Sequence, residues 1–517
     1  EPYDKVWGVG ASGFVVDPSP FGRINLVLDD TAKTTNGEVF AERAVIVTEA
    51  LKAHRNQPRE IAMAEAMAAW FRQCPIIIYP HELLVGTLGV TKKNAPIFPE
   101  FGLDWIIEEM ENGLLGYDPV EHQNDYFTHT EECYQALKQI QPDWDGMDVP
   151  ARFKAILSEE EMKACQWGPS KVFLGDGYTT CGAGHLGANT DRIFHMGYGG
   201  IKQEILDRMA QLNPMDPEDE KRMISLKADL ICNEAASDMI RRYAARAREM
   251  MAEVDETRRK ELEAIAENCE QVAEGTPKTF WQALQALHFA YTMIQMESNG
   301  HSISYGRFDQ YMYPYYKHDI ETGYMTRAQM QELIECFNIK IWDMNKVREH
   351  NSVRIFANGG IGGPALTVGG IKADGTDGTN DITFMCLDAV AHTRIPCPWT
   401  AVRLHANTPH ELKVKTANLI RLGLGEPKIF NDDVTIPTMI ANGRTVEDAR
   451  NYQVVGCVEP DATGKEYGWH DAAYFNCNKV LEIAINHGRT NDGLQVGPDT
   501  GSLEDFTSFD QVLEAYD

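Results

Sequence analysis

The sequence predicts an α/β fold, because its two halves carry different patterns. The first half is rich in helix formers, with alanine, methionine and glutamate crowding residues 41–71 and a long helical pattern over 217–254. In the second half, short apolar stretches with β-branched residues alternate with helical ones. Such alternation is typical of parallel strands joined by crossover helices, where loops at the strand carboxyl ends usually carry the chemistry.

The individual elements follow from the same patterns. Apolar residues recur every three to four positions over 279–298, which predicts a core-facing helix that delivers the segment ESNGHS (297–302) to its carboxyl end. Four strands, each followed by a turn, are expected at 365–368, 399–402, 428–430 and 453–455. Ser508 is a candidate N-cap for a last helix that reaches the end of the sequence without a stop signal.

Composition narrows the class of protein. No proline-, serine- or glycine-rich linker and no repeat interrupts residues 1–517, so we expect one domain that is incomplete at its carboxyl end. The formal net charge of −29 argues against nucleic-acid and membrane-surface partners. Eleven scattered cysteines without a Cys-x-x-Cys pair, no apolar signal segment and no membrane-length apolar run indicate a cytoplasmic protein with reduced thiols.

The sharpest local motif is GCVEP at 456–460, where an apolar strand meets a glycine. Cys457 and Glu459 stand two residues apart, and in an extended segment such residues face the same side, so both could meet one ligand. A buried structural cysteine beside a surface glutamate would have the same spacing, so spacing alone leaves both interpretations open.

Downstream, His470 and Asp471 are expected to open a helix that runs to Asn486. Asp471 is well placed to cap that helix, a role worth about 1 kcal/mol. The same carboxylate could also reach a ligand at the mouth of a strand–loop–helix unit.

Two histidines stand in glycine-containing loops. The segment GAGHLG (182–187) matches G-x-G-x-x-G, but no strand directly precedes it and no helix opens on it, so we interpret it as a glycine-rich loop that presents His185 rather than a dinucleotide site. His301 and Ser302 follow a predicted helix end and could be cap residues or hydroxyl-binding groups. Cys181 with His185, and His405 with His410, offer two ligands each, which completes no metal site.

Taken together, the blocks at 456–460, 297–314 and 468–476 resemble the glycyl radical enzymes, in that family's order and spacing. The resemblance implies a ten-stranded α/β barrel of two antiparallel five-stranded half-barrels surrounded by helices, usually dimeric. Cys457 fits the loop that bears the radical-relay cysteine. No segment resembles the radical-glycine loop, so the glycyl radical domain is expected to lie outside this sequence. Its radical would be installed by a radical S-adenosylmethionine activating enzyme, and no cofactor or metal is expected in the chain itself.

The resemblance also implies the reaction. Gly456 stands where pyruvate formate-lyases carry a second cysteine, which argues against acyl transfer, and the Cys-Val-Glu arrangement is that of the eliminases. The implied activity is a lyase that removes water from a small diol or polyol, with Cys457 as the thiyl radical and Glu459 as the base. Four further residues match the hydroxyl-binding groups of glycerol and propane-1,2-diol dehydratases: His185, Asp471, His301 and Ser302. In that scheme the first two protonate the leaving hydroxide and the last two hold the substrate.

Several alternatives stay open at this point. Residues 348–370 depart from the diol-dehydratase pattern, and Arg354 there is either a counter-charge for an anionic substrate or a solvated loop charge. Within the same family, the site could cleave a C–S or C–N bond, as in hydroxysulfonate or choline lyases, or belong to a hydroxyproline dehydratase or an arylacetate decarboxylase. The non-enzyme alternative is an inactive scaffold subunit.

Overall fold

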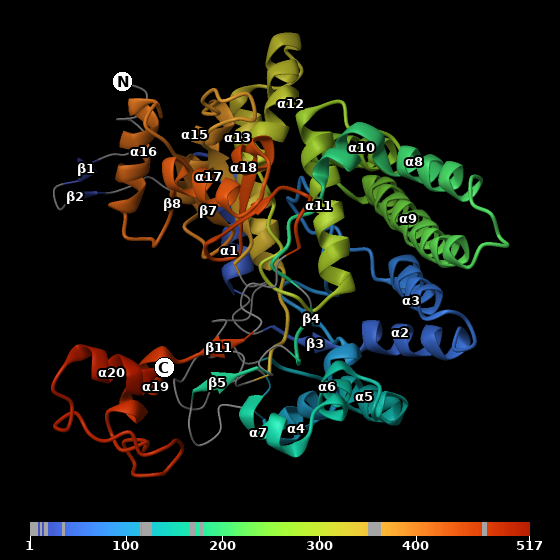
Figure 1. Cartoon of the computed structure of the whole chain (residues 1–517). Helices are drawn as coiled ribbons and strands as arrows, with labels where there is room; N and C mark the ends of the chain where they lie inside the picture. The colour runs from blue at the N-terminus through green and yellow to red at the C-terminus, as the bar shows by residue number, and fades with distance from the viewer. Residues whose placement is uncertain are drawn as a thin grey trace.

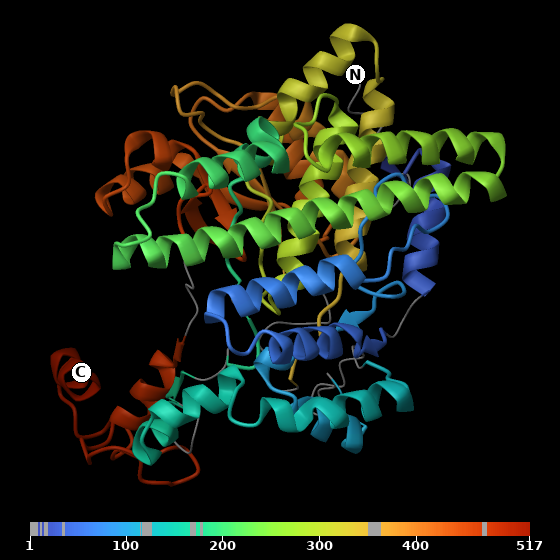
Figure 2. The same cartoon turned by 90° about the vertical axis from the view of Figure 1, so that its right-hand side faces the viewer.

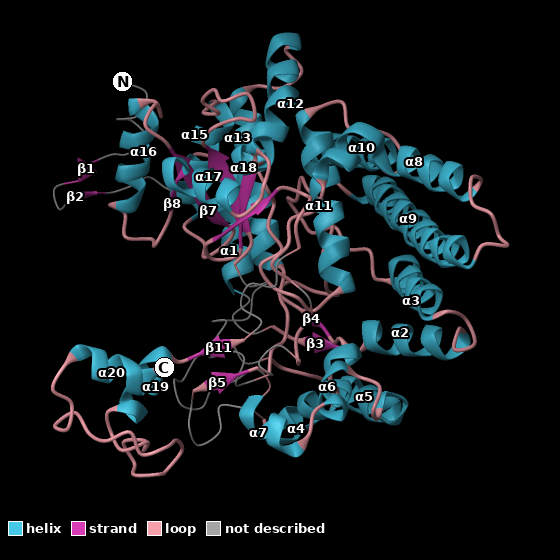
Figure 3. Cartoon of the chain, in the orientation of Figure 1, coloured by secondary structure: helices cyan, strands magenta, loops and turns pink. Residues whose placement is uncertain are grey.

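The structure is a computed structural model that describes residues 9–10, 13–14, 19–33, 37–113, 115, 127–165, 172–175, 179–182, 184–349, 363–467 and 473–517. Most of the described chain is helical, and the longest strands gather in one region (Figure 3). The predicted α/β character is therefore confirmed, with helices wrapped around a small sheet.

Helices of the first half form a stack beside that region, with α3, α8, α9 and α10 side by side (Figures 1 and 2). The predicted pattern at 41–71 is divided between two helices, and that at 217–254 is the long helix α9. The bounds are α1 Gly22–Lys33, α2 Glu42–Ala53, α3 Arg59–Gln73, α4 Asp104–Asn112, α5 Glu131–Trp144, α6 Val149–Ile156, α7 Glu159–Cys165, α8 Thr190–Met209, α9 Pro217–Met250 and α10 Glu256–Val272.

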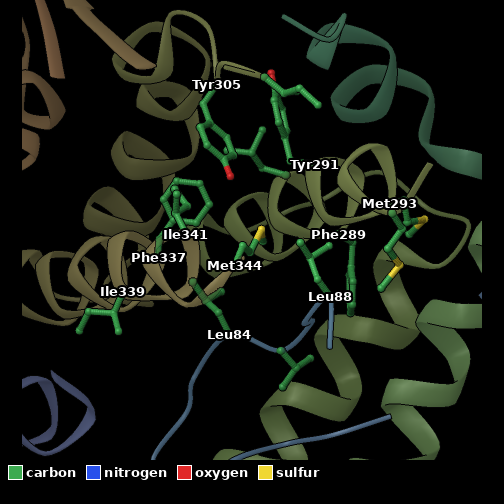
Figure 4. Close-up of a cluster of buried hydrophobic side chains, with 14 of the residues drawn as sticks. Leu84, Leu88, Phe289, Tyr291, Met293, Tyr305, Phe337, Ile339, Ile341 and Met344 are labelled. Atoms are coloured by element: carbon green, nitrogen blue, oxygen red, sulfur yellow. The ribbon is translucent and has the colours of Figure 1, made fainter. Parts of the chain in front are cut away.

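Helix α11 (Phe280–Glu297) is the central core helix, as its apolar periodicity predicts. Thr279 caps it by accepting a hydrogen bond from the backbone N–H of Gln282. Its buried face packs with α13 (Arg327–Asp343) and with Leu84 and Leu88 in the cluster of Figure 4. This rigid packing sets the position of the residues that follow α11, including His301.

The three predicted strands β6 (Ala365–Gly369), β7 (Trp399–Leu404) and β8 (Lys428–Asn431) form a parallel sheet in that order. Helix α12 (Phe308–Thr322) precedes the sheet in sequence and packs against β6. The helices that come after the sheet strands are α15 Asp381–Thr393, α16 His410–Ile420, α17 Asp432–Ala441 and α18 Val446–Arg450. Short strand pairs complete the described part: β1 Val9–Gly10 with β2 Gly13–Phe14, β3 Val39–Phe40 with β4 Ala95–Pro96, and β5 Phe173–Leu174 with β11 Tyr474–Phe475.

The fourth predicted strand, β9 (Tyr452–Val455), is present but does not extend the parallel sheet. It turns back into β10 (Glu459–Ala462) as an antiparallel hairpin. The Val454 N–H donates to Thr367 Oγ1 at 2.8 Å, and Arg403 Nη1 donates to the Tyr452 carbonyl at 2.8 Å, so the hairpin lies on one face of the sheet. The turn of this hairpin lies toward the amino-terminal ends of β6 to β8.

The carboxyl-terminal region corrects one prediction. Tyr474 and Phe475 are a strand paired with β5, and the next helix, α19, spans Cys477–Ala484 with Asn476 as its N-cap. The helix expected to open at His470 therefore begins later, and Asp471 is not its N-cap. Ser508 caps α20 (Phe509–Tyr516) as predicted, by accepting from the Gln511 N–H.

Candidate active site

The turn between β9 and β10 presents Cys457. Because Val455 pairs with Glu459, the turn consists of residues 456–458, and Cys457 lies exposed at its tip. The segment is thus a tight turn and not the extended stretch that the spacing argument assumed. The Gly456 N–H donates to Ser304 Oγ at 3.1 Å, and the same hydroxyl accepts from the Ala365 N–H at 3.0 Å. Ser304 therefore ties the root of the turn to β6 and to the segment that carries His301.

Gly456 is required at this turn for two reasons. Its φ is +60°, and a Cβ there would lie 2.8 Å from His185 Cε1 and 3.0 Å from Glu459 Oε2. We expect Gly456→Ala to lower the free energy of unfolding by about 1–3 kcal/mol and to reduce kcat, because His185 or Glu459 must move. Chemical denaturation and steady-state kinetics measure the two effects. Gly323→Ala is the matched control, since Gly323 has φ +71° with nothing within 4 Å, and equal kcat values for both variants would contradict the prediction.

His185 is presented by the glycine-rich loop, as predicted. A Cβ at Gly184 would lie 2.0 Å from the His301 carbonyl oxygen, so the loop runs directly against the backbone of His301. The His185 N–H donates to that carbonyl at 2.9 Å. His185 has φ +50° and Ser302 has φ +58°, an uncommon conformation for side chains other than glycine that is often found at functional sites.

Glu459, His185 and His301 form a contact chain. Glu459 Oε1 lies 3.1 Å from His185 Nδ1, and His185 Nε2 lies 3.0 Å from His301 Nε2. Both histidines are buried, with 1% and 3% exposure, while Glu459 is half-buried. Since one of the two facing Nε2 atoms must donate to the other, a proton placed on either ring changes the tautomer of its neighbour.

The charge states within this chain follow from its surroundings. Burial alone would raise the pKa of Glu459, but hydrogen bonds from His185 and from the Val458 N–H lower it below its ordinary value of 4.5. Glu459 is therefore an ionised carboxylate that can accept a proton. Burial, together with the nearby guanidinium of Arg348, lowers the pKa of His301 to about 2, so His301 is neutral.

Two basic residues that the sequence analysis did not single out support the turn before His301. Lys346 Nζ donates to the Ser298 carbonyl at 2.6 Å and to the Gly300 carbonyl at 2.8 Å, and Arg348 donates to the Asn299 carbonyl. These bonds hold the segment that carries His301 and Ser302. The basic pair directly after α13 was the signal available in the sequence.

Most of the predicted site residues lie within the described part of the chain. The structure brings His185, His301, Glu459 and the turn bearing Cys457 together, with Ser302 buried beside His301. Asp471 and Arg354 lie outside the described residues. In the described part of the chain, no group of three His, Cys, Asp or Glu side chains is arranged to hold a metal ion. No described helix is both long and apolar enough to span a membrane.

Asp461 of β10 and Glu466, which follows the hairpin, form a pair of interacting carboxyl groups. Asp461 is 1% exposed, and burial together with the neighbouring Glu466 raises its pKa to about 7. Folded Asp461 thus keeps a proton that the unfolded chain, with its ordinary pKa of 3.8, has released, so this group's contribution to stability falls as the pH rises from 3.8 to about 7.

Replacing Asp461 with asparagine should remove this loss. We expect the difference in Tm between Asp461→Asn and the parent protein to increase by a few degrees, in favour of the variant, as the pH rises from 3.8 to about 7. Calorimetry measures this difference. Asp448→Asn is the control. A hydrogen bond from Lys465 lowers the pKa of Asp448, so this variant should lose Tm relative to the parent protein as the pH rises. A Tm difference for Asp461→Asn that does not change with pH would contradict the assignment.

Comparison with known proteins places this arrangement in a family. The family model described as pyruvate formate lyase-like matches residues 18–517. The chain belongs to the pyruvate formate lyase-like family.

Solved structures agree with this assignment. The glycerol-bound form of the B12-independent glycerol dehydratase from Clostridium butyricum superposes on this chain with a TM-score of 0.90. The two sequences are 36% identical, and the match covers 98% of this chain and 62% of that one. A glycyl radical enzyme from Archaeoglobus fulgidus has a TM-score of 0.85 with 26% identity, over 96% and 62%. The α/β barrel of the glycyl radical enzymes is therefore the fold, as the resemblance implied.

Curated members of the pyruvate formate lyase-like family give the same result. A (2S)-3-sulfopropanediol dehydratase from Klebsiella oxytoca is 40% identical over 520 residues, which is 100% of this chain and 62% of that protein. An isethionate sulfite-lyase from Desulfovibrio desulfuricans is 29% identical, over 92% of this chain and 58% of the relative. The chain spans about 62% of the length of the first of these relatives.

Proposed function

We propose that the protein is a glycyl radical lyase that eliminates water from a small diol or polyol. The observation that carries the proposal is the contact chain from Glu459 through His185 to His301, directly beside the turn that bears Cys457. Support also comes from relatives named as dehydratases of sulfopropanediol and of glycerol. In this proposal, Glu459 is the proton acceptor, His185 is the proton relay and Cys457 is the reactive thiol.

The chemistry can be written for the residues of this chain. A thiyl radical on Cys457 takes a hydrogen atom from the carbon that bears one hydroxyl, and Glu459 accepts that hydroxyl's proton. The resulting ketyl radical expels the neighbouring hydroxyl, which leaves as water after receiving a proton from His185, with Asp471 assisting. The product radical takes the hydrogen atom back from Cys457, so one diol yields one carbonyl compound and one water. His301 and Ser302 hold the substrate hydroxyls.

The family's glycyl radical would supply the hydrogen acceptor that turns the Cys457 thiol into a thiyl radical. The described residues fit such a group, because Cys457 is exposed at the tip of its turn and a radical-bearing loop could approach its sulfur. We include a radical S-adenosylmethionine activating enzyme as a partner and a homodimer as the assembly in this proposal.

The test is a substrate panel under anaerobic conditions. The activated protein, with its glycyl radical quantified by electron paramagnetic resonance, is incubated with glycerol, propane-1,2-diol, dihydroxypropane sulfonate, isethionate, choline, hydroxyproline and an arylacetate. Mass spectrometry should find loss of water from a vicinal diol. Release of sulfite, trimethylamine or carbon dioxide as the main product would instead assign a C–S lyase, a C–N lyase or a decarboxylase. Dehydration of hydroxyproline without diol turnover would also contradict the proposed substrate class.

A further inference from the structure

Lys428 is a half-buried ammonium group beside the Cys457 turn. It is the first residue of β8, and it points to the same side of the sheet as Phe430, which packs on the cluster containing Val454 of the hairpin. Its Nζ lies 3.2 Å from the ring centroid of Trp399, which is the first residue of the neighbouring strand β7. Lys428 thus lies on the face of the sheet that carries the hairpin, and its charge is within electrostatic reach of Cys457 and Glu459.

This ammonium lacks the partner that such a group normally has. Three other buried lysines each donate to an oxygen: Lys340 to Glu82, Lys346 to backbone carbonyls, and Lys415 to Asp388. Throughout the part of the chain that the structure describes, no hydrogen-bond acceptor or carboxylate contacts Lys428 Nζ, whose contact is the indole face of Trp399. An ammonium carries three N–H donors, and an aromatic face satisfies only part of that capacity.

Among the described residues, none of the neighbouring carboxylates makes direct contact with Lys428 Nζ. Glu426 is near in sequence, but its Oε2 accepts from the Thr400 N–H at 2.8 Å, and burial raises its pKa to about 7. Burial lowers the pKa of Lys428, against the opposing influence of Cys457, Glu426 and Glu459. An ammonium with N–H donors that no described acceptor uses favours an anionic ligand.

We propose that Lys428, resting on Trp399, binds an anionic group of the substrate, so that the substrate is a short vicinal diol carrying a sulfonate, carboxylate or phosphate. The inference rests on the proposed dehydratase function and specifies its substrate class. Trp399 itself is held in place, because a Cβ at Gly363 would lie 2.1 Å from the indole ring. The aromatic ring therefore limits where Lys428 can direct its N–H groups. The ring itself is packed closely against Gly363.

Kinetics with matched substrates test the specificity. The activated protein and its Lys428→Met variant are compared on 2,3-dihydroxypropane-1-sulfonate, glycerate, glycerol 3-phosphate and glycerol. We expect the ratio of kcat/KM for the preferred anionic diol to that for glycerol to fall at least tenfold, mainly through KM, with Lys428→Arg retaining most of the ratio. The sulfonate, carboxylate and phosphate arms show which anion the site prefers. A ratio that does not change would overturn the inference.

Binding to the unactivated protein separates this inference from the proposed reaction. Calorimetry with 3-hydroxypropane-1-sulfonate, which lacks the second hydroxyl, should show at least tenfold weaker binding to Lys428→Met. Lys465→Met removes the same charge at the opposite end of the hairpin, where Lys465 is exposed and paired with Asp448, and should bind as the parent does. If no diol is dehydrated but this loss of binding is found, the proposed reaction fails and the anion site stands. Equal binding by all three proteins overturns the anion site.

Discussion

Cys457→Ser is expected to abolish turnover while leaving the fold and substrate binding intact. A serine hydroxyl has nearly the same shape as the thiol, but its O–H bond is too strong for the side chain to relay a hydrogen atom. Because Cys457 is exposed at the tip of a turn, the change should alter the free energy of unfolding by less than about 0.5 kcal/mol. Product formation by mass spectrometry and thermal unfolding measure the two effects.

The control for this variant is Cys477→Ser, which changes another exposed thiol at the start of α19. We expect that protein to keep its activity. Electron paramagnetic resonance should detect the glycyl radical in both variants, since its formation does not require Cys457 to react with substrate. Substantial turnover by Cys457→Ser would remove the thiyl mechanism.

Glu459→Gln should lower kcat by at least about 100-fold, the usual range for loss of a general base. Glutamine preserves the size of the side chain and can still hydrogen-bond to His185, but it cannot accept the substrate proton. Because hydrogen bonds lower the pKa of Glu459 below 4.5, the parent enzyme should lose activity through protonation of this group only below that pH. The pH dependence of kcat therefore provides a second measurement of its charge state.

Glu447→Gln is a suitable control, since Glu447 is an exposed residue of α18 that precedes the same hairpin. Its kcat should stay within about twofold of the parent value, as expected for a surface change away from the site. If Glu459→Gln retained the parent kcat as well, Glu459 would be a structural partner of His185 and another group would have to serve as base.

Local sequence patterns were sufficient for much of the framework. The periodic helix α11, the Ser508 cap and the strands β6 to β9 were all predicted near their observed positions. These features depend on residues within a few positions of one another, so the sequence carries them directly. The candidate residues of the Cys457 turn and the two histidine loops were also visible as motifs.

Long-range pairing decided the rest. The stretch after His470 has the composition of a helix, yet Tyr474 and Phe475 pair with β5, and the helix begins only at Cys477. Tertiary contacts override local preference in such a short segment. Likewise, β9 reads as one more parallel strand, but it folds back on β10, because the turn at Gly456 permits a conformation that other residues adopt only at a cost.

By itself, therefore, the sequence determined the helices and strands that carry strong local patterns, and it indicated the candidate residues of the site. Only the tertiary structure decided that Glu459 reaches His185, that His185 reaches His301, and that Lys428 rests on Trp399. The physical reason is that hydrogen bonds and ion contacts act over a few ångströms, between residues that lie far apart along the chain. Their partners become neighbours when the helix-supported loops and the sheet pack together, and no local pattern encodes that distance.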